Sequence, residues 1–101
     1  MKKVAEALIK ERRFGEVICA YLEITKPSIP EAIDGAVKGG ASEIRVLPYF
    51  LLTGKHVTRH IPQIVARARR KHKNRVKILL CPYLGYHEKI VSVVKQRIWE
   101  A

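Results

Sequence analysis

The chain has 101 residues and a formal net charge of +11, which comes from 20 lysines and arginines against 9 aspartates and glutamates. A chain of this length forms about one small domain, so we expect a single domain over residues 1–101. Its apolar stretches fall short of the roughly 20 residues that a membrane-spanning helix needs, and residues 2–13 do not resemble a signal peptide. The composition therefore predicts a soluble, cytoplasmic protein with an anionic substrate or partner.

The first half of the chain predicts helix, strand and helix. Residues 2–13 place apolar side chains on one face, as in an amphipathic helix. Residues 17–22 (VICAYL) form a continuous apolar run, which is typical of a parallel strand that is covered on both faces. Ser28 and Glu31 have the spacing of a capping box, so they predict the start of a second helix, which ends at Gly39.

The second half continues the same alternation. Residues 44–52 predict a strand that runs into a loop at 53–55, and residues 58–72 predict a helix that buries Ile61, Ile64, Val65 and Ala68. Residues 76–81 predict a third strand, and residues 86–100 a last helix with Ile90, Val91, Val94 and Ile98 on its apolar side. Helices that alternate with strands predict an α/β fold with a parallel sheet.

Cys19 and Cys81 are the two cysteines of the chain. They are too few for a disulfide framework, and both stand in apolar runs. We expect both to be reduced and buried.

Parallel sheets bind ligands beyond the carboxyl ends of their strands, so the loops at 22–28, 50–58 and 81–87 are where we expect a site. Metal-binding and charged side chains gather in or beside these loops. They include Glu23, Lys26, Lys55, His56, His60 and His87.

Six segments of the chain also carry a resemblance. They are AYLE (20–23), PSIPEA (27–32), LPYFLL (47–52), GKHV (54–57), IP (61–62) and CPYLGYH (81–87). In this order they resemble the small sirohydrochlorin cobaltochelatases, the CbiX type of class II chelatases. The likeness runs from about residue 4 to the end of the chain.

The resemblance implies a three-layer, flavodoxin-like fold with a parallel sheet. It also implies an enzyme that inserts Co²⁺, or in some members Ni²⁺ or Fe²⁺, into the tetrapyrrole sirohydrochlorin without ATP. Such enzymes serve cobalamin, sirohaem or related biosynthesis. No organic cofactor is implied, because the metal ion is a substrate.

His56 falls on the metal-binding histidine of the family, and Glu23 falls on its carboxylate. Metal insertion needs a neutral imidazole that binds a divalent ion and a base that accepts pyrrole protons, and histidine can do both near neutral pH. Sirohydrochlorin carries many carboxylates, which suits a basic protein. We expect substrate contacts from Lys26, Gly54, Lys55, Arg59 and His87.

The sequence departs from the family pattern in two places. Family members begin with a central strand that ends in Gly-His-Gly-Ser and supplies a second metal histidine, and this strand has no counterpart here. His60 stands where the family usually has an acidic residue. It follows His56 by four residues, so the two could share one helix face and together partly replace the missing ligand.

The absent first strand leaves three alternatives. Another copy of the chain supplies it in a homo-oligomer, the remaining strands pair differently, or the chain is a shortened form of a longer product. Trp99 is expected to pack or to make an oligomer contact.

Other interpretations stay open for single residues and for the function. His56 and His87 could cap helices, Glu23 could cap or pair with Lys26, and His60 could be an exposed substitution. The basic stretch 67–77 could bind nucleic acid, although it lacks the interleaved aromatic residues of such modules. The chain could also be a structural half that a partner completes.

Overall fold

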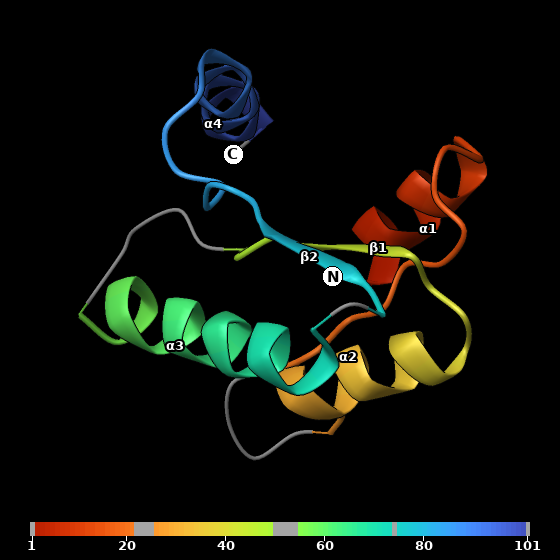
Figure 1. The fold of residues 1–101 in the computed structure, drawn as a ribbon. Coiled ribbons are helices and arrows are strands. Elements are labelled where there is room, and N and C mark those ends of the chain that lie inside the picture. The colour runs from red at the N-terminus through yellow and green to blue at the C-terminus, as the bar shows by residue number, and fades with distance from the viewer. Residues whose placement is uncertain (1, 22–25, 50–54, 74, 101) are drawn as a thin grey trace.

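A computed structural model describes residues 2–21, 26–49, 55–73 and 75–100, with the backbone only for residues 55–58. Four helices and two strands occupy these ranges (Figure 1). In chain order they are α1 (Lys2–Lys10), α2 (Ile29–Lys38), β1 (Glu43–Val46), α3 (Lys55–His72), β2 (Lys77–Leu80) and α4 (Glu88–Glu100).

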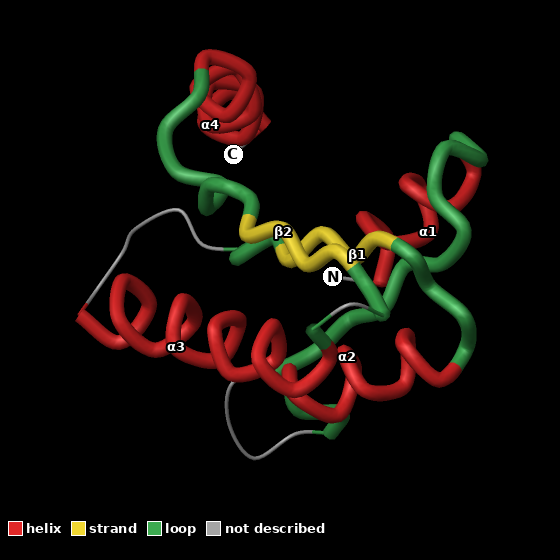
Figure 2. The backbone as a smooth tube through the Cα atoms, in the orientation of Figure 1, coloured by secondary structure: helices red, strands yellow, loops and turns green. Residues whose placement is uncertain are grey.

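The two strands form an open parallel sheet, in which Glu43 lies opposite Lys77 and Val46 opposite Leu80. Helices α2 and α3 cover one face of this sheet, while α1 and α4 lie on its other side (Figures 1 and 2). The predicted fold class, α/β with a parallel sheet, is therefore confirmed.

The core lies between α2, α3 and the sheet. Val65 of α3 is 1% exposed, and it packs with Ile33 of α2 and Ile78 of β2. Ile61 and Ala68 lie one turn to either side of Val65 and are also buried, as the helical periodicity predicts. Ile64, which was also predicted to be buried, is half-buried.

The predicted strand at 17–22 is not formed in residues 17–21, and Leu22 lies outside the described residues. A single parallel bridge joins Tyr21 to Ser28, in which the Tyr21 N–H donates to the Pro27 carbonyl over 3.0 Å. A strand exists only where a neighbour pairs with it, and within the described ranges no strand lies beside this segment. The apolar run alone therefore gave a wrong prediction here.

The other strands are shorter than predicted. β1 ends at Val46 rather than at 52, and Pro48 has no N–H with which to extend the pairing. Residues 50–52 lie outside the described residues. β2 ends at Leu80, two residues before Pro82.

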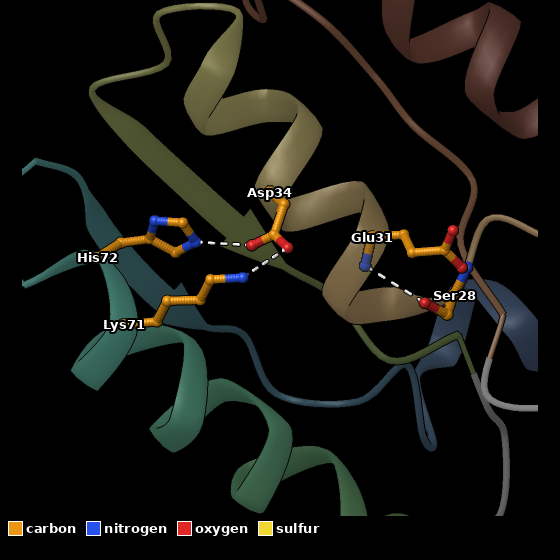
Figure 3. Close-up of polar contacts among 5 residues, drawn as sticks. All are labelled: Ser28, Glu31, Asp34, Lys71 and His72. Atoms are coloured by element: carbon orange, nitrogen blue, oxygen red, sulfur yellow. Dashed lines mark hydrogen bonds and ion pairs between the residues drawn. The ribbon is translucent and has the colours of Figure 1, made fainter.

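Helix α2 begins at the predicted capping box. The Glu31 N–H donates to Ser28 Oγ over 3.3 Å, and the Ser28 N–H donates to Glu31 Oε1 over 3.2 Å (Figure 3). Hydrogen bonding from Ser28, first from its side chain and then from its backbone N–H, lowers the pKa of the Glu31 carboxyl. Gly39 then ends the helix, also as predicted.

An ion pair and a buried imidazole join α2 to the last turn of α3 (Figure 3). Lys71 Nζ lies 2.9 Å from Asp34 Oδ2, and His72 Nε2 lies 2.7 Å from Asp34 Oδ1. The bonds from Lys71, then from His72, lower the pKa of Asp34. His72 is 7% exposed, and its buried Nδ1 has no hydrogen-bond partner among the described residues. Within that part of the chain, Asp34 therefore provides the hydrogen bond of the imidazole.

Helices α1 and α4 have no buried residue. On the predicted apolar side of α4, Ile90 and Val91 are half-buried, whereas Val94 and Ile98 are exposed. The periodicity identified an amphipathic helix but not what would cover it. Trp99 is 85% exposed, so the predicted packing of this residue is absent from the described part of the chain.

Two further expectations concern the cysteines and the membrane. Cys19 and Cys81 are free thiols, as predicted, but both are half-buried rather than buried. Among the described helices, none is long and apolar enough to cross a membrane.

Replacing Asp34 tests the link between α2 and α3. Asp34→Ala leaves the buried His72 Nε2 without its acceptor, so we expect the free energy of unfolding at pH 7 to fall by about 1–3 kcal/mol in urea titrations. Because the pKa of Asp34 is lowered in the folded state, the stabilisation is complete above the unfolded pKa of about 4. It is lost as the pH falls through the folded pKa, so wild type and variant should converge in acid.

Lys71→Ala is the matched control, because it removes only the exposed partner of Asp34. We expect it to cost less than about 1 kcal/mol. Equal effects of the two substitutions at every pH would show that the buried imidazole contributes nothing.

Candidate active site

The carboxyl ends of both strands meet at one edge of the sheet, where the segments 47–49 and 81–87 run on from β1 and β2. The Cys81 N–H donates to the Val46 carbonyl over 2.8 Å, and the Leu84 N–H donates to the Pro48 carbonyl over 3.2 Å. These backbone bonds hold the two segments side by side. They form the described part of the site that the sequence predicts.

Helix α3 begins at this edge, three residues earlier than predicted. Its start at Lys55 places His56 in the first turn and His60 one turn further on, so the two residues share a side of the helix. The helix therefore extends far enough to hold His56 and His60 on one face, which the predicted histidine pair requires. The side chains of Lys55 and His56 are not among those described, and Glu23 and Gly54 lie outside the described residues.

Two expected substrate-binding cations are exposed to solvent. Arg59 projects from the second turn of α3, and Lys26 precedes α2. The positive charge of Lys26 makes a small contribution to the lowered pKa of Glu31, behind the two hydrogen bonds from Ser28 and opposed by desolvation. Both cations are available to an anion, and His60 is exposed as well.

His87 caps α4. Its Nδ1 accepts the Lys89 N–H over 3.1 Å, and its carbonyl accepts the N–H groups of Ile90 and Val91. The capping interpretation of His87 is thus confirmed. An Nδ1 that accepts a hydrogen bond carries no proton, which leaves Nε2 as the ring atom for the predicted substrate contact.

Within the described part of the chain, no group of three or more histidine, cysteine or acidic residues could hold a metal ion. The side chains of two of the three predicted ligands, Glu23 and His56, lie outside the described part of the chain. The predicted ligand set of His56, Glu23 and His60 therefore stays a prediction.

The sequence interpretation missed an exposed apolar surface at this edge. Its members are Leu47, Tyr49, Tyr83, Leu84 and Tyr86, each between 37% and 81% exposed. Gly85, in the segment 81–87, has φ +57°, a backbone conformation that favours glycine. The pattern Tyr-x-Gly at the end of a predicted strand is the sequence signal that could have indicated this apolar surface.

The basic stretch 67–77 lies at the opposite end of α3. An 18-residue helix is about 27 Å long, so this cluster is far from the first turn. Two of its cations serve the fold, since Lys71 pairs with Asp34 and Arg69 Nε donates to the Ile78 carbonyl over 2.9 Å. The cluster is therefore not part of the carboxyl-edge site.

Comparison with known proteins gives consistent results. The CbiX family model matches residues 1–101. A sirohydrochlorin cobaltochelatase of Saccharolobus islandicus is 33% identical over 103 residues, which cover 97% of this chain and 79% of that protein. A sirohydrochlorin cobaltochelatase of Priestia megaterium is 30% identical over 98 residues. This match spans about a third (31%) of the length of that longer protein.

Two solved structures share the fold. A cobalamin biosynthesis CbiX protein from Marinobacter aquaeolei VT8 superposes with a TM-score of 0.76 at 25% identity, covering 99% of this chain and 83% of that one. The sirohydrochlorin chelatase SirB from Bacillus subtilis subspecies spizizenii, in complex with cobalt, superposes with a TM-score of 0.85 at 27% identity. That match covers 98% of this chain and 42% of SirB. By sequence and by fold, the chain belongs to the CbiX family.

Proposed function

We propose that this chain is a chelatase that inserts a divalent metal ion, in the first place Co²⁺, into sirohydrochlorin. The observation that carries the proposal is the alignment of nearly the whole chain with most of a sirohydrochlorin cobaltochelatase. Ni²⁺ and Fe²⁺ are the alternative metals. Cobalamin or sirohaem biosynthesis is the corresponding pathway, and the metal ion is a substrate rather than a resident cofactor.

His56 is the proposed metal-binding and proton-accepting residue. Entry of M²⁺ into the macrocycle releases two pyrrole N–H protons, so the site needs both a ligand for the incoming ion and a base. His56 stands in the first turn of α3, and an imidazole can serve in both roles near neutral pH. The neutral ring is the form that binds metal. Glu23 and His60 are the further proposed ligands.

Cations around the edge would hold the substrate by its carboxylates. Lys26 and Arg59 are exposed, and Lys55 begins the helix that carries His56. His87 could add a contact through Nε2, and Gly54 would allow a close approach of the backbone. Charge attraction of this kind raises the rate of encounter with an anionic substrate.

We also propose that residues 1–101 fold as one domain that acts as a homo-oligomer. The carbonyls of Ser42 and Val46 face β2, so the alternating backbone groups of β1, such as those of Glu43 and Arg45, face the other edge of the strand. A strand from a second copy could pair there. Pairing with a different partner chain is the structural alternative.

Nucleic-acid binding is the competing proposal, and the basic stretch 67–77 gives it little support. Arg69 and Lys71 already bond within the fold. The stretch contains no phenylalanine, tyrosine or tryptophan on which a base could stack.

Metal insertion is tested by incubating the chain with sirohydrochlorin and Co²⁺ and following the absorption change of the tetrapyrrole. We expect His56→Ala to slow insertion by at least about 100-fold, because it removes a ligand and a general base together. Gln63→Ala, an exposed change on the same helix, is the control and should keep the wild-type rate. A wild type no faster than the uncatalysed reaction would refute the proposed function.

The histidine pair is tested by titrating Co²⁺ or Ni²⁺ into the wild type and His60→Ala without tetrapyrrole. If both imidazoles bind the ion, losing one should weaken the affinity by about tenfold or more. Gln63→Ala again provides the reference. Unchanged affinity in His60→Ala would remove His60 from the metal site.

A further inference from the structure

We propose that the Tyr83 ring, held in place by Gly85, is the platform on which the flat face of the tetrapyrrole stacks. This inference rests on the proposed function, and it names the surface that binds the macrocycle rather than its carboxylates. Three observations carry it. They are the gathering of apolar side chains at one edge, the backbone bonds that unite them, and the packing of one ring on a glycine.

The first observation is where the apolar side chains lie. Among the described residues, most other exposed large apolar side chains belong to the helices α1 and α4. The carboxyl edge has its own group from two separate segments, Leu47 and Tyr49 after β1 and Tyr83, Leu84 and Tyr86 after β2. Exposed apolar area costs roughly 25 cal/mol per Å², so an apolar surface beside a site indicates a ligand.

The second observation is that the two segments form one surface. The bond from Cys81 N–H to the Val46 carbonyl continues the strand register, in which Val46 pairs with Leu80. The next bond runs from Leu84 N–H to the Pro48 carbonyl, one residue later than that register requires. The extra residue falls at Cys81–Tyr83, where the chain bulges as it passes the edge.

The third observation concerns the Tyr83 ring. A Cβ on Gly85 would lie 3.0 Å from Cε2, 3.3 Å from Cζ and 3.5 Å from Cδ2 of Tyr83. The ring therefore packs directly against the Gly85 backbone, which is buried beneath it, and Gly85 has a positive φ that other residues rarely adopt. Tyr83 nevertheless stays 43% exposed. One side of the ring is supported by Gly85, and part of the ring stays accessible to a ligand.

The occupant that fits is a broad, flat conjugated ring with charged substituents at its rim. Aromatic rings attract one another in offset stacks, and a ring that is already supported loses little freedom on binding. Five residues separate Tyr49 from Lys55, the first residue of α3. Lys55 and His56 therefore follow this surface closely along the chain. A platform there would support the macrocycle while the first turn of α3 delivers the metal.

A platform that binds substrate and transition state alike should change KM rather than kcat. The experiment measures binding of metal-free sirohydrochlorin by its fluorescence change, together with KM and kcat for Co²⁺ insertion. We expect Tyr83→Ala to weaken binding and raise KM by about tenfold with kcat nearly unchanged. Tyr83→Phe keeps the ring and should retain most of the affinity, while Tyr83→Leu should resemble Tyr83→Ala.

Phe14→Ala is the control, because it removes an exposed aromatic ring from the segment after α1 rather than from the carboxyl edge. Circular dichroism verifies that each variant is folded. Gly85→Ala displaces the ring without removing it and should also raise KM. If the wild type binds the tetrapyrrole and Tyr83→Ala binds equally well, the platform is refuted and the proposed function stands. If the wild type binds no tetrapyrrole, both are refuted.

Discussion

The packing of α3 across the sheet, with Val65 buried against Ile78, determines how the rest of the molecule is arranged. A helix that connects two parallel strands must run back against their direction, so it begins at their carboxyl ends and finishes at their amino ends. The first turn of α3 therefore lies toward the same end of the sheet as the loops after β1 and β2 (Figure 1). The candidate site follows from this connection.

The two ends of α3 consequently have different tasks. At its last turn, Asp34 holds Lys71 and His72, and Arg69 occupies the Ile78 carbonyl at the outer edge of β2. These side chains stabilise the fold, and Arg69 also covers an exposed strand edge. At its first turns stand Lys55 and Arg59 with the two histidines. The high positive charge that is visible in the sequence thus includes a structural cluster and the cations that we propose to bind the substrate.

Local sequence signals correctly predicted the ends of α2 and the buried side of α3. The Ser28–Glu31 capping box, the end of α2 at Gly39 and the buried stripe of α3 depend on residues within a turn or two of each other, and the structure has all three. The motifs around residues 47–62 and 81–87 identified the family. His87 shows the limit of a motif, because the structure gives its ring a capping bond that the family resemblance did not imply.

Features that depend on distant partners could not be predicted in the same way. The run at 17–22 has the composition of a strand, but strand formation requires a neighbour that sequence composition does not show. The apolar side of α4 is correctly placed on the helix, yet Ile98 and Trp99 are exposed because amphipathicity does not specify a cover. The role that we propose for Tyr83 could not be predicted, because it depends on a shifted register and on ring packing against Gly85.

The central claim is that metal transfer takes place at the carboxyl edge of the sheet. Paramagnetic broadening of amide NMR signals by substoichiometric Co²⁺ tests it most directly, since broadening reports distance from the bound ion. The account predicts that signals from the first turns of α3 and from residues 47–49 and 82–87 broaden first, while those around Asp34 and His72 stay sharp. Broadening centred on Asp34 and His72, with the carboxyl edge unaffected, would contradict it.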